Sequence, residues 1–284
     1  METVLACPVC GAVLTLTATT AACANKHTFD RARNGYVNLL LSTKKQSAEP
    51  GDSLAMLKSR RAFLQGGYYD QMAAAAIAAF DGVEGHVADL GCGEGFFTTR
   101  VYAALPGSTL YGVDISRPGI KMAASHVENA GPRTGPGTGN INWIVASLHR
   151  SPFLPASLTA ALSIFAPIDA ADVRRVLRAD GALITVTPGP DHLDALRAII
   201  YTSAKPHSAT PALMAGDTLF AHASSTRIRY PIVVESHAQI MNLLAMTPYY
   251  WHISPWAMAA IETLPRLELT VDAYVNVFRP EKLV

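Results

Sequence analysis

Short apolar segments recur along the body of the chain, and each is followed by a longer stretch with helical character. Because strands buried on both faces of a sheet carry continuous apolar runs, these segments predict the strands of a parallel sheet. The segments are Val87–Leu90, Leu110–Ile115, Ile141–Ala146, Ala160–Ala166 and Ala182–Thr187. Strands that alternate with helices indicate βαβ units. The sequence therefore predicts an α/β fold, a mostly parallel sheet with helices on both faces.

Two later segments and one earlier segment complete this picture. Residues alternate between apolar and polar over Arg227–Val234 and Leu267–Phe278, which predicts an antiparallel pair of strands at one edge of the sheet. Upstream of the sheet, Asp52 or Ser53 is positioned to cap a helix over residues 54–64.

Composition and charge restrict the class of protein. The chain has 284 residues, of which 50% are hydrophobic and 16% charged, so we expect a sizeable core in one large or two modest domains. No apolar run is long and uncharged enough to cross a bilayer, and the first residues lack the pattern of a secretory signal. We therefore expect a cytoplasmic protein with no membrane partner. The formal net charge of +1 does not by itself indicate nucleic-acid binding.

The candidate chemistry concentrates where the first predicted strand of the sheet ends. After Asp89, a turn with three alternating glycines leads into a helical stretch. Glycines at this point let the backbone turn sharply and approach a ligand closely. The next strand ends in Asp114, followed by Ile115, and an acid there can bind both hydroxyls of a ribose. Together these motifs predict a cofactor that contains adenosine.

The spacing of the glycines indicates which cofactor this is. A dinucleotide site has the pattern Gly-x-Gly-x-x-Gly, in which the second glycine makes room for a pyrophosphate. Here Glu94 stands in the turn, and its carboxylate would repel two phosphates but suits a positively charged sulfonium. We therefore expect S-adenosylmethionine; the alternative is a glycine-rich turn with a purely structural role. The predicted cofactor-binding residues are Asp89, Gly91, Gly93, Glu94, Gly95, Asp114 and Ile115.

A cluster of metal-binding residue types lies near the amino end, in the order Cys7-x2-Cys10-x12-Cys23-x3-His27. Two close pairs of sulfur or nitrogen donors, separated by a stretch with the composition of a β-hairpin, are typical of a tetrahedral zinc site. Four protein ligands close such a site, so the zinc is expected to be structural. The alternative is three ordinary thiols and a surface histidine.

Taken in order, the motifs resemble those of one family, the RlmA-type large-subunit ribosomal RNA (guanine-N1)-methyltransferases. The resemblance covers nearly the whole chain and implies a class I, Rossmann-like methyltransferase fold preceded by a small zinc-binding β module. We expect a zinc-binding module over residues 1–40, a linker and helices over 41–84 and the methyltransferase domain over 85–284. Besides the Cys/His cluster, the resemblance rests on His27–Asp30, Gly35–Leu40, Pro50–Ser53, Arg60–Leu64, Asp89–Gly95, Phe165–Pro167, Thr187–Leu193 and Met246–Pro248.

The resemblance also implies what these residues bind. It assigns zinc to Cys7, Cys10, Cys23 and His27, and it assigns cofactor contacts to Tyr69, Gly93, Glu94 and His192. The implied substrate is N1 of a guanine in large-subunit ribosomal RNA, with Phe165 at the mouth of the site, and we expect the base to stack on Phe165 or Tyr36. Contacts with an RNA hairpin are expected from Arg31, Arg33, Lys44, Lys45, Arg60, Arg61 and Arg150.

Methylation at N1 of guanine needs a general base, because this nitrogen carries a proton and is a poor nucleophile until the proton leaves. The candidate catalytic residues are His149 and Asp169, which follow predicted strands near the expected mouth of the site. An ordinary surface role is the alternative for each of them.

Two other functions stay open at this point. The near-neutral charge and the apolar acceptor region favour a methyltransferase that acts on a small heteroaromatic, indole-like molecule. A non-catalytic, RNA-binding zinc protein is the second alternative. The sequence does not specify the number of subunits, and a homodimer is left open.

Overall fold

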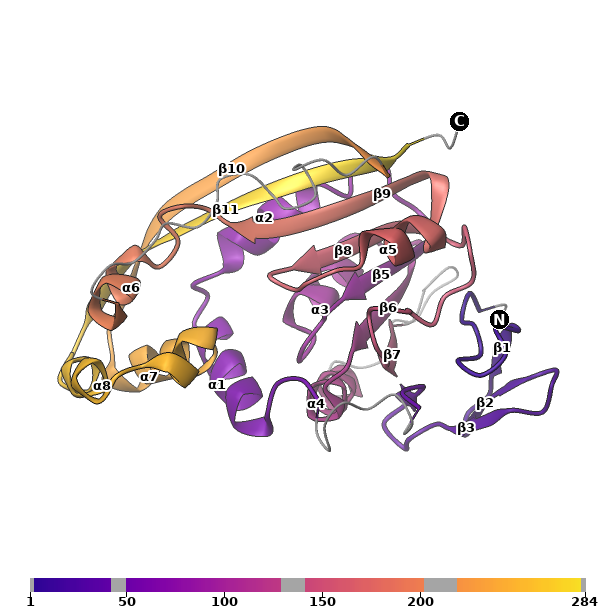
Figure 1. Ribbon diagram of the computed structural model, residues 1–284, viewed down its shortest axis with the longest axis horizontal. Coiled ribbons are helices and arrows are strands. Elements are labelled where there is room, and N and C mark those ends of the chain that lie inside the picture. The colour runs from indigo at the N-terminus through magenta and orange to yellow at the C-terminus, as the bar shows by residue number, and fades with distance from the viewer. Residues whose placement is uncertain (1–2, 42–49, 129–140, 202–218, 282–284) are drawn as a thin grey trace.

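One eight-stranded sheet organises the molecule. The computed structural model describes residues 3–41, 50–128, 141–201 and 219–281. The order of the strands is β10-β11-β9-β8-β5-β6-β7-β4 (Figure 1). Neighbouring strands from β4 to β9 are parallel, whereas β11 is antiparallel to both β9 and β10. The strands are β4 (Val37–Asn38), β5 (His86–Leu90), β6 (Thr109–Asp114), β7 (Ile141–Val145), β8 (Leu158–Ile164), β9 (Leu177–Pro188), β10 (Phe220–Val234) and β11 (Leu267–Pro280). The predicted parallel sheet with an antiparallel pair at one edge is confirmed.

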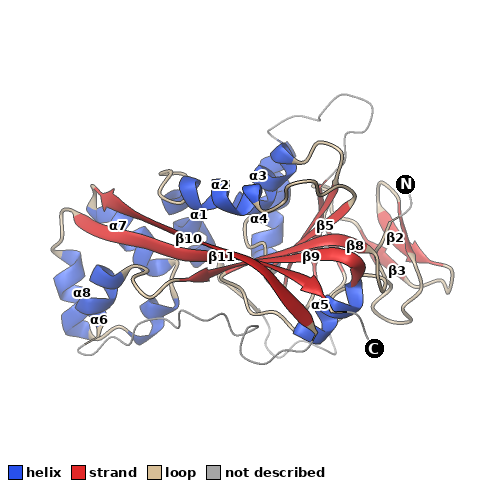
Figure 2. Cartoon of the chain, turned by 90° about the horizontal axis from the view of Figure 1, so that it is seen from above, coloured by secondary structure: helices blue, strands red, loops and turns tan. Residues whose placement is uncertain are grey.

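Helices cover both faces of this sheet, as the sequence predicts (Figure 2). Side chains that are consecutive along a strand enter different cores: Val87 packs in one hydrophobic cluster with α2 and α3, and Ala88 packs in another with α5. This alternation is the period-2 geometry of a strand that is buried on both faces. The helices are α1 (Leu54–Leu64), α2 (Asp70–Ala78), α3 (Phe96–Ala104), α4 (Arg117–Glu128), α5 (Ala170–Val176), α6 (Asp194–Ile200), α7 (His237–Ala245), the 3-10 helix η3 (Pro248–His252) and α8 (Pro255–Glu262).

Local backbone chemistry determines where two of these elements begin and end. Helix α1 begins at Leu54 because Ser53 caps it, its hydroxyl accepting a hydrogen bond from the backbone N–H of Met56 at 3.3 Å. Strand β8 ends at Ile164, two residues earlier than predicted. Phe165 has a φ of +52°, in the left-handed region that interrupts a strand.

A small three-stranded antiparallel sheet forms the amino end of the molecule, opposite the end that carries α6, α7 and α8 (Figures 1 and 2). Its strands are β1 (Leu14–Leu16), β2 (Thr20–Cys23) and β3 (Thr28–Asp30). The segment before β1 pairs with the loop after β7 through an antiparallel bridge between Leu5 and Phe153. Leu5 and Leu14 are fully buried in the same cluster as α5. The small sheet therefore packs on the large one.

Strand β4 is a second connection between the amino-terminal segment and the large sheet, and the sequence did not predict it. It consists of Val37 and Asn38, which pair in parallel with Ile144 and Val145 at the edge of the large sheet. Two residues are too short a segment for an alternating pattern to be recognised.

None of the helices in the described part of the chain is long and apolar enough to pass through a membrane.

Candidate active site and zinc site

A cavity of about 1140 Å³ opens at the carboxyl ends of the parallel strands, where ligands bind in open α/β sheets. Its walls come from the glycine-rich turn after β5, the ends of β6, β8 and β9, one side of α1 along its length and the segment around η3. The structure brings most of the predicted cofactor residues to these walls. They are Tyr69, Asp89, Gly91, Gly93, Glu94, Asp114, Ile115 and His192.

Two glycines of the turn are required by their surroundings. A Cβ on Gly91 would lie 2.5 Å from that of Ala166, so this glycine lets the loop after β8 close against the turn. Gly95, with a φ of +87°, is the amino-terminal cap of α3, and a Cβ here would lie 2.7 Å from the ring of Trp143. Gly95 is not among the residues that line the cavity, so its part in the turn is to let α3 pack closely.

Three carboxyl groups lie in the walls of the cavity: those of Asp89 and Glu94 are buried, and that of Asp114 is half-buried. Asp114 accepts hydrogen bonds from the backbone N–H groups of Gly93, at 2.8 Å, and Ser116, at 2.7 Å. Asp89 accepts one from the hydroxyl of Thr98 at 2.6 Å. Burial raises the pKa of Asp89 to about 7, and it also raises the pKa values of Glu94 and Asp114. A cavity with several desolvated acids favours a cationic ligand that contains hydroxyl groups.

Two arginines of α1 compensate part of this negative charge. The Nε of Arg61 lies 3.5 Å from Glu94, and Arg60 forms an ion pair with Asp52 at 2.5 Å. Arg31, from the amino end, likewise turns inward and donates to the backbone carbonyl of Gly35 at 2.8 Å. Of the basic residues expected to contact RNA, these three are therefore engaged within the protein. Arg33 and Arg150 are exposed, and Lys44 and Lys45 lie outside the described residues.

Aromatic side chains also line the cavity. The ring of Phe165, 42% exposed, lies 5.2 Å from that of His192 and 6.5 Å from that of Tyr69, measured between centroids. Trp251, 63% exposed, also lines the cavity. The sequence analysis missed Trp251, although three adjacent aromatic residues after Pro248 are a signal that could have identified it. These rings suit a planar aromatic acceptor.

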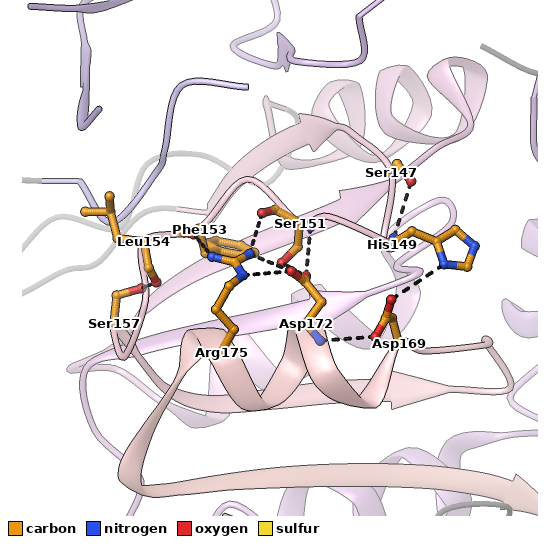
Figure 3. Close-up of polar contacts among 9 residues, drawn as sticks. All are labelled: Ser147, His149, Ser151, Phe153, Leu154, Ser157, Asp169, Asp172 and Arg175. Atoms are coloured by element: carbon orange, nitrogen blue, oxygen red, sulfur yellow. Dashed lines mark hydrogen bonds and ion pairs between the residues drawn. The ribbon is translucent and has the colours of Figure 1, made fainter. Parts of the chain in front are cut away.

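The two candidate catalytic residues lie together, but at the rim and not among the lining residues. Nδ1 of His149 is 3.9 Å from Oδ2 of Asp169, and His149 is 90% exposed (Figure 3). Their sequence neighbours Leu148, Ile168 and Ala170 do line the cavity.

A buried polar network holds the loop with His149 against α5 (Figure 3). Asp172 accepts hydrogen bonds from the backbone N–H of Ser151, at 2.8 Å, and from Arg175. Arg175 donates in addition to the carbonyl oxygens of Phe153, at 2.8 Å, and Ser151, at 3.0 Å. The position of the rim is therefore fixed by a charged side chain that binds backbone groups directly.

The four predicted zinc ligands also come together. Their ligand atoms all lie within 4.8 Å of one another. Sγ of Cys10 is 3.8 Å from Sγ of Cys23, and Nδ1 of His27 is 3.7 Å from Sγ of Cys7 and 3.5 Å from Sγ of Cys23. In a tetrahedron with zinc–sulfur bonds of about 2.3 Å, two sulfurs lie about 3.8 Å apart. The cluster therefore fits zinc, bound through Nδ1 of the histidine, with four protein ligands and no open position.

The strand order, the cavity and the Cys/His cluster together define a class of protein. Residues 87–181 match a family described as "Methyltransferase domain", and residues 5–48 match the zinc ribbon described as "RlmA, N-terminal". The solved structure of YcgJ from Bacillus subtilis shares the fold, with a TM-score of 0.50 and 14% identity over 75% of this chain and 100% of that one. The protein is a class I, S-adenosylmethionine-dependent methyltransferase with an amino-terminal zinc ribbon.

Two relatives identify the family within this class. The 23S rRNA (guanine(748)-N(1))-methyltransferase of Streptomyces fradiae is 32% identical, over 97% of this chain and 96% of that protein. A relative from Micromonospora griseorubida is 31% identical, again over 97% of this chain and 96% of its own length. The chain belongs to the RlmA-type family of 23S rRNA (guanine-N1)-methyltransferases, which confirms the resemblance seen in the sequence.

The burial of Asp89 predicts a pH-dependent stability. Because its pKa is raised, the folded protein holds a proton that the unfolded chain has released, so stability decreases as the pH rises from about 4 to about 7. Between pH 5 and pH 8 the ligand-free wild type should therefore lose at most about 3 kcal/mol of stability, and Asp89→Asn should not show this loss. Thermal unfolding of both proteins at the two pH values measures this. The same variant should bind S-adenosylmethionine more weakly in calorimetry; unchanged binding would contradict the placement of this acid beside a cation.

The zinc cluster predicts that its cysteines and the remaining cysteine respond differently to substitution. Cys23→Ser should lose the bound zinc and lower the unfolding temperature, because the metal supplies folding energy to a small module. Cys92→Ser, in the glycine-rich turn, is the control and should retain one zinc ion per chain in elemental analysis. Retention of zinc by the Cys23 variant would refute the assignment of this ligand.

Proposed function

We propose that this protein transfers a methyl group from S-adenosylmethionine to N1 of a guanine in 23S ribosomal RNA. The proposal rests on family membership over nearly the whole chain, together with one cavity whose walls include both acids and exposed aromatic rings. We also propose the division of labour expected from the sequence: residues 1–40 bind zinc, 41–84 connect, and 85–284 bind the cofactor and methylate.

The acids in the walls of the cavity would hold the cofactor. Asp114 would accept hydrogen bonds from the ribose hydroxyls, and Asp89 and Glu94 would balance the positive charge. The adenosine would lie against the backbone of the turn at Gly93, which carries no side chain. Bound S-adenosylmethionine supplies an electrophilic methyl group: the lone pair of N1 bonds to the methyl carbon, and the electron pair of the carbon–sulfur bond returns to sulfur.

The aromatic rings of the cavity would hold the acceptor base. A guanine in an RNA hairpin has to leave its stack to reach a cavity of this kind, and aromatic rings replace the stacking that it loses. Phe165 would contact one face of the base, and its left-handed backbone, which costs of order 1–3 kcal/mol, is the kind of strain found at ligand sites. Trp251 would contact the base or the nucleotide next to it.

The proton of N1 would leave through the rim. The carboxylate of Asp169 faces Nδ1 of His149 and favours a proton on that nitrogen, so that Nε2 is left to accept one. Because the imidazole is exposed, it can pass the proton to water. Arg150, next to it and exposed, and Arg33 of the amino-terminal module would contact the phosphates of the hairpin.

A small heteroaromatic acceptor is the second candidate substrate. It is favoured by apolar side chains in the walls of the cavity, such as Ile168 and Trp251, and because three of the arginines expected to bind RNA have partners within the protein. Such a substrate would fill the same place between the aromatic rings and the cofactor.

One labelling experiment separates these functions. The protein is incubated with methyl-labelled S-adenosylmethionine and either unmethylated 23S rRNA or a panel of small heteroaromatic compounds. We expect label in the RNA, recovered as N1-methylguanosine after digestion, and a steep decrease in RNA binding as the salt concentration rises. Label only in a small compound would replace the RNA proposal with the second candidate, and label in neither would leave the non-catalytic alternative.

The proton path predicts the behaviour of variants at the rim. His149→Ala should lower the rate of RNA methylation on the order of 10²-fold, because a positioned general base contributes about that much. Affinity for the cofactor, measured by calorimetry, should be unchanged. Asp114→Asn is the contrasting variant, since it should weaken cofactor binding itself. A normal rate with His149→Ala would remove this residue from the proton path.

A further inference from the structure

In the described part of the chain, the cavity is lined by four acids and by one side chain with a permanent positive charge. The acids are Asp52, Asp89, Glu94 and Asp114, and the positive side chain is Arg60. An anionic group of a ligand is therefore repelled by most of the charged groups in the walls. Of these lining residues, Arg60 alone attracts an anion through its charge.

The guanidinium of Arg60 lies over the glycine-rich turn and is held there by an ion pair. Its Nη2 is 2.5 Å from Oδ2 of Asp52, whereas its Nη1 lies 3.1 Å from the position that a Cβ on Gly93 would take. The side chain is 26% exposed. A guanidinium has five N–H donors in one plane, so it can keep its bond to Asp52 and still bind a second carboxylate.

The positive charge of Arg60 acts on residues that the sequence analysis assigns to the cofactor. Burial raises the pKa values of Tyr69, Glu94 and Asp114, and in each case the charge of Arg60 opposes this rise. These three residues lie just before α2, in the turn after β5 and at the end of β6. Arg60 is therefore close to three separate segments of the cofactor site.

Neighbouring groups with a positive charge or a titratable ring are placed differently. Arg61 and Arg100 also act on Glu94, but neither is among the residues that line the cavity. Arg61 is 3.5 Å from Glu94, and Arg100 is paired with Asp70 at 3.2 Å. His192 lines the cavity, but its Nδ1 accepts a hydrogen bond from a backbone N–H of β11 at 3.3 Å, so the ring is neutral.

We propose that Arg60 binds the carboxylate of the methionine part of S-adenosylmethionine. This cofactor carries a sulfonium and an ammonium group, which the acids attract, and a carboxylate, which they repel. With the ribose on Asp114 and the carboxylate on Arg60, the cofactor would be fixed on both sides of its sulfonium, and the methyl group would be held in one position. The proposal rests on the proposed function for its cofactor and is independent of the acceptor.

Calorimetry of the full-length protein tests this contact with two ligands, S-adenosylmethionine and decarboxylated S-adenosylmethionine, which lacks only the carboxylate. We expect the wild type to bind the complete cofactor about 10- to 100-fold more tightly, the range that corresponds to a hydrogen bond between charged groups. Arg60→Met should weaken binding of the complete cofactor without weakening that of the decarboxylated one. The preference should then fall to a few-fold or reverse, because the decarboxylated ligand has the larger positive charge beside the acids.

Two further variants separate this contact from a general effect of charge. Lys58→Met removes a positive charge from an exposed position on the same helix, outside the cavity, and should keep the preference of the wild type. Arg60→Lys keeps the charge but lacks the planar fork of the guanidinium, so its preference should be intermediate. Undiminished binding of the decarboxylated ligand by Arg60→Met also shows that this variant is folded.

The outcomes distinguish this proposal from the proposed function. If Arg60→Met keeps the full preference, or loses affinity for both ligands equally, the proposal is overturned. The first result would assign the carboxylate to another group, such as the backbone N–H groups at the amino end of α3, and the second would make Arg60 a structural residue. If the wild type shows the preference but leaves RNA unlabelled, the contact stands and the proposed substrate fails. If the wild type binds neither ligand, both proposals fail.

Discussion

The hydrogen bond from the backbone of Gly93 to the carboxylate of Asp114 is the contact on which the site depends. It joins the turn after β5 to the end of β6, and so places an acid and a bare segment of backbone on the same wall of the cavity. A peptide N–H stabilises a carboxylate that burial would otherwise disfavour. Asp89 and Glu94 are brought into the same low-dielectric space by this turn. Because burial disfavours the charged form of these acids, the cavity favours a ligand with a positive charge.

Much of the architecture could be predicted from the sequence, because it follows from short-range patterns. The strands from Val87 to Thr187 are continuous apolar runs, and the capping hydroxyl of Ser53 is a local signal. The four zinc ligands follow from donor type and spacing alone, and the structure brings them together. Where the backbone adopts an uncommon conformation, the pattern failed: β8 stops short because Phe165 is left-handed, which no apolar run can indicate.

Only some of the residues that line the cavity could be predicted from the sequence. Acids and glycines at strand ends are close in sequence to the elements that position them. Trp251 arrives from a segment far along the chain, and the inward orientation of Arg60 and Arg61 depends on partners, Asp52 and Glu94, that only the folded chain brings near. The residue type alone does not indicate whether an arginine is exposed to solvent or paired with a buried carboxylate. Tertiary pairing of this kind is not encoded in any local spacing.

The antiparallel bridge between Leu5 and Phe153 connects the zinc ribbon directly to the rim of the cavity. Two residues after Leu5 the chain enters the zinc cluster, and a few residues before Phe153 it carries His149. The zinc ribbon and the rim are thus parts of one backbone ladder, extended by Arg175 to the helix behind it. RNA bound to the zinc ribbon would therefore act on a segment whose backbone is paired with the loop at the rim. Binding of the RNA and the position of His149 would be mechanically coupled.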